Sequence, residues 1–385
     1  MMNNYWRKLS TEARIDVDHL IAGLHNVELL EGMSKYAHCT GLYFPRVIAA
    51  LKQLPQKHWD AALAVFGSVI YVPRTVLSAS MQYLWWAVHA SAESLGSRLS
   101  EGGDDILVTE VDQDGLGPEF ARLNGLSARL NGSVHPRLGD VQRFRYALFD
   151  LLNGTGQEQA HASAQLRLAS SKKAWLILTD KALSGQSLLG DLRKITYARD
   201  LVAEATGCRP DIYVVAQIST ATAENEVTEW VQSESVEGIT FLSAVRLDGR
   251  AQVGNPECRL FSSETHKLVI SLCEWFDKEI VSKDLSLATF RERSSGSLAL
   301  GYRNTGITLV DYRNTPTNSL PLLWFNSRDP DAQYEPGAPR PKYVGPFPRV
   351  HSRRGKEDSR WSESTLWEEI LRPSSRETIL DRLSS

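Results

Sequence analysis

The sequence predicts an α/β protein with a parallel sheet, a helical N-terminal domain and a proline-rich C-terminal tail. Three patterns support this: helical apolar spacing in the first hundred residues, alternating strands and helices after them, and clustered prolines at the end. At about 150 residues per domain, the 385 residues suffice for two to three domains. The expected domains are residues 1–100, 104–326 and 327–385.

Residues 1–100 are expected to form three helices. The first lies near residues 10–24, the second is interrupted at Pro55, and the third begins after Pro73. The third helix carries apolar residues at helical spacing: Leu77, Met81, Leu84, Trp85 and Val88. We interpret this stripe as core or subunit interface rather than a cofactor site, which leaves the oligomeric state open. The glycine-rich, acidic segment 96–105 is expected to be a domain boundary.

Four buried-type strands alternate with helices in the middle of the chain. The strands are expected at residues 106–111, 174–178, 212–218 and 239–245. Helices are expected at residues 120–130, 188–205, 223–230 and after Ser263, and Gly207 is a candidate C-cap. This alternation is typical of a parallel sheet covered on both faces. Residues 298–302 and 307–312 are expected to form a hairpin or a pair of edge strands.

Composition excludes several classes of protein. A net charge of −3 favours no particular partner, and four scattered cysteines make neither a zinc ribbon nor a disulfide scaffold. The least polar stretch, residues 61–92, is split by Pro73 and diluted by polar residues, so buried helices are expected rather than a membrane span. Because the polar start shows no secretory signal, we expect a reducing, cytoplasmic location.

The most informative segment is residues 175–187, which read WLILTDKALSGQS. A buried strand delivers Asp180 at its carboxyl end, and a short loop then leads into a helix. Free N–H groups at a helix N-terminus bind phosphate, Ser184 and Ser187 add hydroxyl donors, and Gly185 allows close approach of an oxyanion. Ligands of open α/β sheets bind at this edge. The alternative is an ordinary strand-to-helix turn.

These residues resemble the PRPP signature of type I phosphoribosyltransferases, in which two acids follow four apolar residues and precede a Thr/Ser-Gly-x-Thr/Ser loop. Here Asp180 is the second acid, whereas Thr179 replaces the first acid and Lys181 replaces an apolar residue. The resemblance implies that the acid holds the ribose hydroxyls and that the loop holds the 5-phosphate. The implied binding residues are Thr179, Asp180, Lys181, Ser184, Gly185, Gln186 and Ser187.

The resemblance also implies a pyrophosphate loop after the first core strand. The loop at that place is unusually acidic and contains Glu110, Asp112, Gln113, Asp114 and Gly115. The acids of this loop could act through Mg²⁺, the expected metal. Alternatively, they exclude pyrophosphate, and the sequence does not distinguish the two interpretations. Asp112, Asp114 and Asp180 are the candidate catalytic residues, with no particular metal ligands assigned.

The whole layout is similar to divergent phosphoribosyltransferase-like proteins of bacterial conflict systems, including those beside retron reverse transcriptases. A late segment supports this, with Gly301, Tyr302, Asn314, Pro316, Asn318 and residues 321–324. The resemblance implies a defence effector, partnered by a reverse transcriptase and its DNA or RNA product. It would perform glycosyl transfer or N-glycosidic cleavage on a phosphorylated ribose compound or nucleotide. The alternative, favoured by Thr179, is an inactive nucleotide-sensing scaffold that binds a protein or nucleic acid.

The proline-rich tail is basic and contains aromatic residues. Between residues 340 and 356 it has no acid, and its aromatic residues are Tyr343 and Phe347. Basic residues bind phosphate backbones and aromatic rings stack on unpaired bases, so we expect nucleic-acid binding. The candidate residues are Arg340, Lys342, Arg349, Arg353 and Arg354. A solvated tail or a protein-docking arm is the alternative, and a short helix is expected at residues 364–371.

Overall fold

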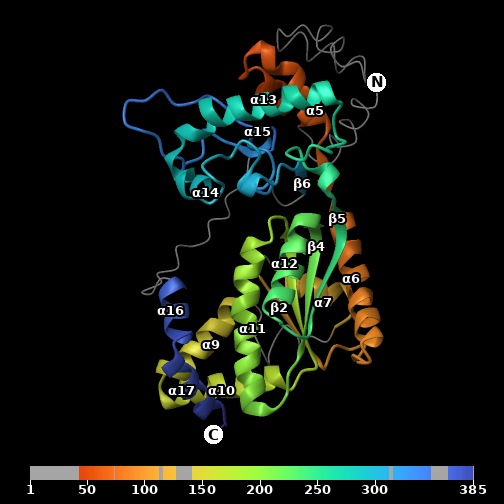
Figure 1. The fold of residues 1–385 in the computed structure, drawn as a ribbon, viewed down its shortest axis with the longest axis vertical. Helices are drawn as coiled ribbons and strands as arrows, with labels where there is room; N and C mark the ends of the chain where they lie inside the picture. The colour runs from red at the N-terminus through yellow and green to blue at the C-terminus, as the bar shows by residue number, and fades with distance from the viewer. Residues whose placement is uncertain are drawn as a thin grey trace. The chain divides into compact units, whose positions relative to one another are not determined.

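The computed structural model describes residues 43–72, 74–111, 116–126, 141–311, 315–347 and 363–384. The chain forms two compact units: unit 1 is Met1–Arg74 with Gly249–His351, and unit 2 is Thr75–Asp248 with Ser352–Ser385. Each unit therefore combines early and late segments (Figure 1). The division differs from the boundary expected near residues 96–105. The helix expected near residues 10–24 lies outside the described residues.

Unit 2 is built on a four-stranded parallel sheet. Its strands are β2 (Ile106–Glu110), β3 (Ala174–Ala182), β4 (Asp211–Thr220) and β5 (Ile239–Leu247). This confirms the predicted α/β class and all four predicted strands. The spatial order is β2-β3-β4-β5, so the described sheet has no point at which the strand order reverses. The carboxyl ends of the strands still meet at one edge, where the ligand site was expected.

Helices cover both faces of this sheet. The larger layer contains α9 (Val141–Asn153), α10 (Gly156–Ser170), α11 (Gln186–Thr206), α12 (Ala221–Ser233), α16 (Glu363–Ile370) and α17 (Pro373–Ser384). The opposite layer contains α6 (Arg74–Ser94) and α7 (Leu116–Leu123). Gly207 ends α11 with φ 73°, as expected for a C-cap.

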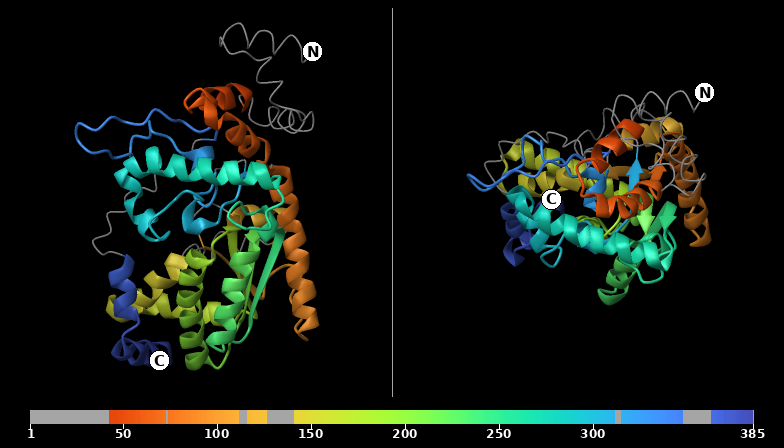
Figure 2. Two further views of the ribbon diagram at one scale, coloured as in Figure 1. Left: turned by 45° about the horizontal axis from the view of Figure 1, so that its top comes forward. Right: turned by 90° about the horizontal axis from the view of Figure 1, so that it is seen from above.

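Helix α6 explains why unit 2 begins so early in the chain. Its residues Met81, Leu84 and Val88 are buried against the sheet, which confirms the predicted apolar stripe as core. Figure 2 shows α6 in orange alongside the strands. A helix that covers one sheet face belongs to the same folding unit as the sheet, so the chain does not divide after this helix.

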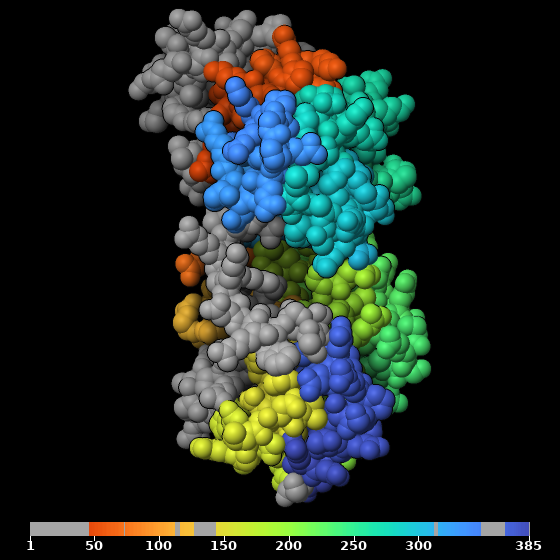
Figure 3. All heavy atoms as spheres, turned by 90° about the vertical axis from the view of Figure 1, so that its left-hand side faces the viewer, coloured from red at the N-terminus to blue at the C-terminus, as the bar shows by residue number. Residues whose placement is uncertain are grey.

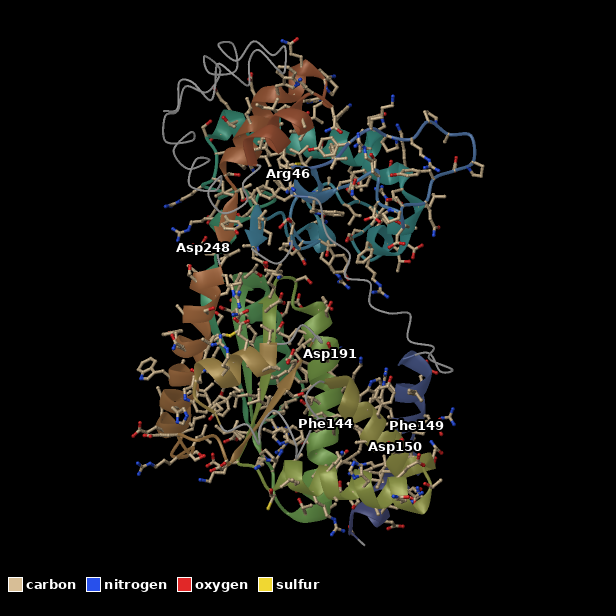
Figure 4. All side chains as sticks on the ribbon, turned by 180° about the vertical axis from the view of Figure 1, so that it is seen from behind. Arg46, Phe144, Phe149, Asp150, Asp191 and Asp248 are labelled. Carbon is tan, nitrogen blue, oxygen red and sulfur yellow. The ribbon has the colours of Figure 1, made fainter. Side chains whose placement is uncertain are left out.

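The end of the chain is part of the core of unit 2. Trp367, Ile370, Ile379 and Leu383 are buried among residues of α9, α10 and α11. Figure 3 shows α16 and α17 in dark blue against the yellow helices. In the same core Phe144, labelled in Figure 4, packs on Trp175 with ring centroids 4.9 Å apart. The predicted helix at residues 364–371 is confirmed as α16, whereas α17 was not predicted.

Unit 1 is mostly helical. Its longer helices are α4 (Tyr43–Leu51), α5 (Trp59–Gly67) and α13 (Ser263–Glu279). Its shorter elements are η1 (Gln56–His58), η2 (Gly249–Ala251), η3 (Val281–Lys283), η4 (Leu285–Leu287), α14 (Ala288–Glu292), η5 (Tyr302–Asn304) and α15 (Pro321–Trp324). The break predicted at Pro55 is confirmed between α4 and η1. None of the helices within the described ranges has the length and apolar character needed to cross a bilayer.

Of the hairpin or pair of edge strands expected at residues 298–302 and 307–312, the second strand is present and the first is not. Strand β6 (Leu309–Asp311) pairs in parallel with β1 (Ile70–Val72), a segment from the other end of the chain. Residues 298–301 form no strand, because Gly301 turns the chain with φ 75° into η5. A Cβ at Gly301 would lie 2.5 Å from the carbonyl oxygen of Asn318, so this turn needs glycine.

The proline-rich segment 327–347 has no helix or strand beyond one isolated bridge, Asn326 to Val344, as expected. Its end, residues 343–347, nevertheless packs into the core of unit 1, whereas most residues between 328 and 342 are exposed. Tyr343 is fully buried, its hydroxyl donates to the Leu322 carbonyl oxygen at 2.7 Å, and its ring lies 4.6 Å from that of Phe276. Phe347 is also buried. The prediction that these two rings stack on bases is therefore wrong, because both belong to the core.

Candidate functional site

The strand–loop–helix arrangement predicted around Asp180 is present at the carboxyl edge of the sheet. Strand β3 ends at Ala182, and Gly185 is the N-cap of α11 with φ 77°. No described side chain caps this end of the helix. The N–H groups of the first turn of α11 and the positive end of the helix dipole therefore remain available to an anion.

Gly185 is required by the protein's own packing. A Cβ placed on it would lie 3.0 Å from Cβ of Glu226 and 3.2 Å from Cα of Ala223, both on α12. From the sequence, this glycine is expected to allow close approach of an oxyanion. In the structure the close neighbour is a helix, and the positive φ angle is a second reason for glycine.

Asp180 forms an ion pair with its neighbour Lys181. Nζ of Lys181 lies 2.5 Å from Oδ2 of Asp180, and the two side chains are only 14% and 13% exposed. The replacement of an apolar residue by Lys181 thus places a compensating positive charge on the remaining acid. A ribose hydroxyl that binds Asp180 would share the carboxylate with this ammonium group.

Thr179, at the position of the missing acid, does not join Asp180. Its side chain is 4% exposed, and its Oγ1 donates to the carbonyl oxygen of Lys181 at 3.3 Å. Thr179 carries no carboxylate, and its hydroxyl bonds to the backbone of Lys181 rather than to the Asp180 side chain. Only one carboxylate of the predicted pair is therefore present.

Helix α12 brings in acidic residues that the sequence analysis missed. Gln186 Nε2 donates to Glu226 Oε2 at 2.6 Å, which ties the predicted loop to α12. Of the loop serines, Ser184 is half-buried and Ser187 is exposed. The missed signal was the position of α12 directly after β4, because helices that follow adjacent parallel strands begin at the same edge.

A second polar cluster lies where β4 and β5 end. Glu224 accepts hydrogen bonds from Ser219 at 2.7 Å and Ser243 at 2.9 Å, and pairs with Arg246 at 2.5 Å. These contacts satisfy the carboxylate within the protein. We therefore assign Glu224 a role in holding the strand ends rather than in binding a ligand.

Glu110, expected in the pyrophosphate loop, serves as a cap for helix α7. Its carboxylate accepts hydrogen bonds from the backbone N–H groups of Leu116 at 3.0 Å and Gly117 at 2.6 Å. A carboxylate at a helix N-terminus takes the place that an anionic ligand would otherwise occupy. The other residues expected in this loop lie outside the described residues: Asp112, Gln113, Asp114 and Gly115.

Of the acids expected to act through Mg²⁺, the structure describes Glu110 and Asp180 but neither Asp112 nor Asp114, so the Mg²⁺ site stays a prediction. The Asp180 carboxylate, the hard oxygen donor of the site, already holds the Lys181 ammonium group. Across the described ranges, no three histidine, cysteine or acidic side chains are grouped closely enough to hold a metal.

The basic residues of the predicted nucleic-acid site are described only in part. Arg340 and Lys342 are exposed, and the Arg340 guanidinium lies 5.6 Å from the centre of the Tyr334 ring. Arg349, Arg353 and Arg354 lie outside the described residues. With Tyr343 and Phe347 buried, any contact with nucleic acid here would be electrostatic.

A parallel sheet with a strand-end acid and an open helix N-terminus is an α/β architecture that suits a phosphorylated ligand. The family model PRTase-CE matches residues 142–340, more than half of the 385 residues, so the chain belongs to the PRTase-CE family. The match includes the β3–α11 loop and begins after the acidic loop that follows β2. No curated protein and no solved structure matches the chain.

Proposed function

We propose that this protein binds a phosphoribosyl compound or nucleotide at the β3–α11 loop and acts at its glycosidic carbon. The observation that supports this is the uncapped N-terminus of α11, one short loop from Asp180, in a chain of the PRTase-CE family. A phosphate bound to the N–H groups of the first turn would neutralise the positive end of the helix. Asp180, at the end of β3, is then the acid proposed to accept the sugar hydroxyls.

The chemistry would depend mainly on electrostatics. Donors fixed at the loop would hold the phosphate, and the Asp180 carboxylate, paired with Lys181, would accept hydrogen bonds from the ribose hydroxyls. The separation of a leaving group from the anomeric carbon develops positive charge on the sugar, which the Asp180 carboxylate would stabilise. In this proposal Mg²⁺ arrives bound to the ligand's own phosphates, as is common for this ion.

We further propose that the protein is an effector of a retron-type antiviral defence system, with a reverse transcriptase and its nucleic-acid product as partners. The support is family membership together with the late Gly301-Tyr302 segment. Co-purification of the tagged protein with a reverse transcriptase encoded beside it would test the partnership. Recovery of the protein alone, under conditions that preserve the other complexes of the cell, would contradict it.

An inactive nucleotide-sensing scaffold is the second candidate. The buried Thr179 favours it, since one carboxylate of the usual pair is missing. Both candidates require ligand binding at the β3–α11 loop, and only the enzyme turns its ligand over. Incubation with PRPP and a panel of nucleotides, followed by chromatography of the products, separates them.

Asp180→Asn is expected to weaken binding of PRPP or the cognate nucleotide. A hydrogen bond from a hydroxyl to a carboxylate contributes about 1.5–3 kcal/mol, or about 10- to 150-fold in affinity. Calorimetric titration of the parent and the variant measures the loss. Thermal melts of both proteins check that the ion pair with Lys181 is not needed for folding.

Glu226→Gln is the matched control, because it also removes one negative charge beside the loop without changing side-chain shape. If charge alone mattered, both variants would bind a phosphate more tightly. We expect Glu226→Gln to bind as tightly as the parent, or up to about fivefold more tightly, as for one half-buried charge that does not contact the ligand. Equal affinity of Asp180→Asn and the parent for every ligand that binds would contradict the proposed site.

A further inference from the structure

Unit 1 contains a cavity that the proposed function does not use. The cavity has a volume of about 190 Å³. It is bordered by η4, α14, α15 and the segment that follows α15; Figure 1 labels α14 and α15. Its lining includes the aromatic residues Phe290, Trp324 and Phe325 and the acidic residues Asp284, Asp329 and Asp331. All six residues belong to unit 1.

Asp284 has one satisfied oxygen and one open oxygen. The residue is 5% exposed, and its Oδ1 accepts hydrogen bonds from the Ser286 N–H at 3.0 Å, the Ser286 hydroxyl at 2.7 Å and the Gln333 N–H at 3.0 Å. No described residue donates to Oδ2. Three donors fix this carboxylate through one oxygen, so the other oxygen is open at the cavity, where a ligand donor could bond it in place of water.

The rest of the cavity combines aromatic surface with further negative charge. The Phe290 ring is 37% exposed, and the indole N–H of Trp324 is already bonded to the Ser319 carbonyl oxygen at 2.8 Å. Burial, followed by the negative charge of Asp284, raises the pKa of the neighbouring Tyr334 hydroxyl to about 12. The nearby cation Arg340 lies over the Tyr334 ring. The site therefore favours a positively charged ligand with an apolar or planar face.

We propose that this cavity binds a guanidinium group. A guanidinium is planar, stacks on aromatic rings and forms short hydrogen bonds to a carboxylate, so it matches both parts of the lining. A metal ion fits less well, because the described acids do not form a metal-binding group. The guanidinium could come from a small metabolite or from an arginine side chain of a peptide. This proposal is independent of the β3–α11 site.

Ethylguanidinium is the probe, and ethylurea is its uncharged counterpart of similar shape. Saturation-transfer NMR with the full chain detects weak binding of either compound. We expect ethylguanidinium to bind and ethylurea to bind at least tenfold more weakly. An arginine-containing tetrapeptide that binds more tightly than ethylguanidinium would identify a peptide as the source, and equal or weaker binding would identify a small molecule.

Asp284→Asn should weaken ethylguanidinium binding at least tenfold, since the amide keeps the shape and one acceptor but loses the charge. Glu257→Gln, an exposed acid elsewhere in unit 1, should change nothing. If Asp284→Asn does not fold, Phe290→Leu provides the second test, with an expected two- to fivefold loss. Equal binding of ethylurea, no effect of Asp284→Asn or Phe290→Leu, or no binding of ethylguanidinium to the parent would overturn the proposal.

Discussion

A chain that ends at residue 362 is expected to lose the cooperative unfolding transition of unit 2. The deletion removes α16 and α17, whose buried side chains Trp367, Ile370, Ile379 and Leu383 are part of the core. Truncation of one large buried side chain costs about 2–5 kcal/mol, and a whole domain is stable by only about 5–15 kcal/mol. Removal of four such side chains therefore exceeds the stability of a typical domain. Thermal unfolding followed by circular dichroism measures the effect.

Single substitutions supply the control for this deletion. Ile379→Ala should destabilise the protein by about 2–4 kcal/mol, whereas Glu377→Ala, on the exposed side of α17, should stay within about 0.5 kcal/mol. A shortened chain that melts like the parent would show that α16 and α17 are not part of the core.

Truncation after Asn326 would in addition remove Tyr343 and Phe347 from unit 1. Nucleic-acid binding is therefore better tested by substitution of Arg340 and Lys342.

Gly185→Leu is expected to destabilise unit 2 and abolish ligand binding at the loop. A non-glycine residue at φ 77° costs about 1–2 kcal/mol. The new side chain would also push against Ala223 and Glu226, which lie 3.2 and 3.0 Å from the position of its Cβ. Relief of this clash moves α11 away from α12 and displaces the loop N–H groups. Denaturant unfolding and calorimetry measure the two effects.

Gly207 offers a matched comparison at the other end of α11. It has φ 73°, and a Cβ there would meet nothing within 4 Å. Gly207→Ala therefore has the conformational cost alone, whereas Gly185→Ala has the same cost and the contact with α12. We expect Gly185→Ala to be more destabilising by about 1 kcal/mol or more. Equal free energies of unfolding for the two variants would show that the contact with α12 is unimportant.

Local patterns were sufficient to predict most of unit 2. The apolar run 174–178, the acid that follows it and the Ser-Gly loop are consecutive in sequence, so strand β3, the loop and helix α11 could all be predicted together. The same holds for β4 and β5, two long apolar strands separated by one helix, although β5 is only half-buried in the structure. Alternation of this kind has one common structural solution, a parallel sheet.

Contacts between distant segments could not be predicted in this way. The pairing of β1 with β6 and the burial of Tyr343 both join parts of the chain that share no local pattern. The aromatic residues of the tail are the clearest example of a contact that local patterns do not predict. An aromatic residue between basic residues has the same sequence pattern whether it is buried or exposed. The contact between Gln186 and Glu226 depends in turn on how α12 packs beside the loop.

Hydrogen–deuterium exchange at the N–H groups of residues 186–188, with and without saturating PRPP or nucleotide, tests the proposed site most directly. These N–H groups lie in the uncapped first turn of α11, so they should exchange rapidly in the free protein. A bound phosphate should slow their exchange at least tenfold. The N–H of Ala223, already bonded to Thr220, should be unaffected. Unchanged exchange at residues 186–188, with a ligand shown by calorimetry to be bound, would contradict phosphate binding at this loop.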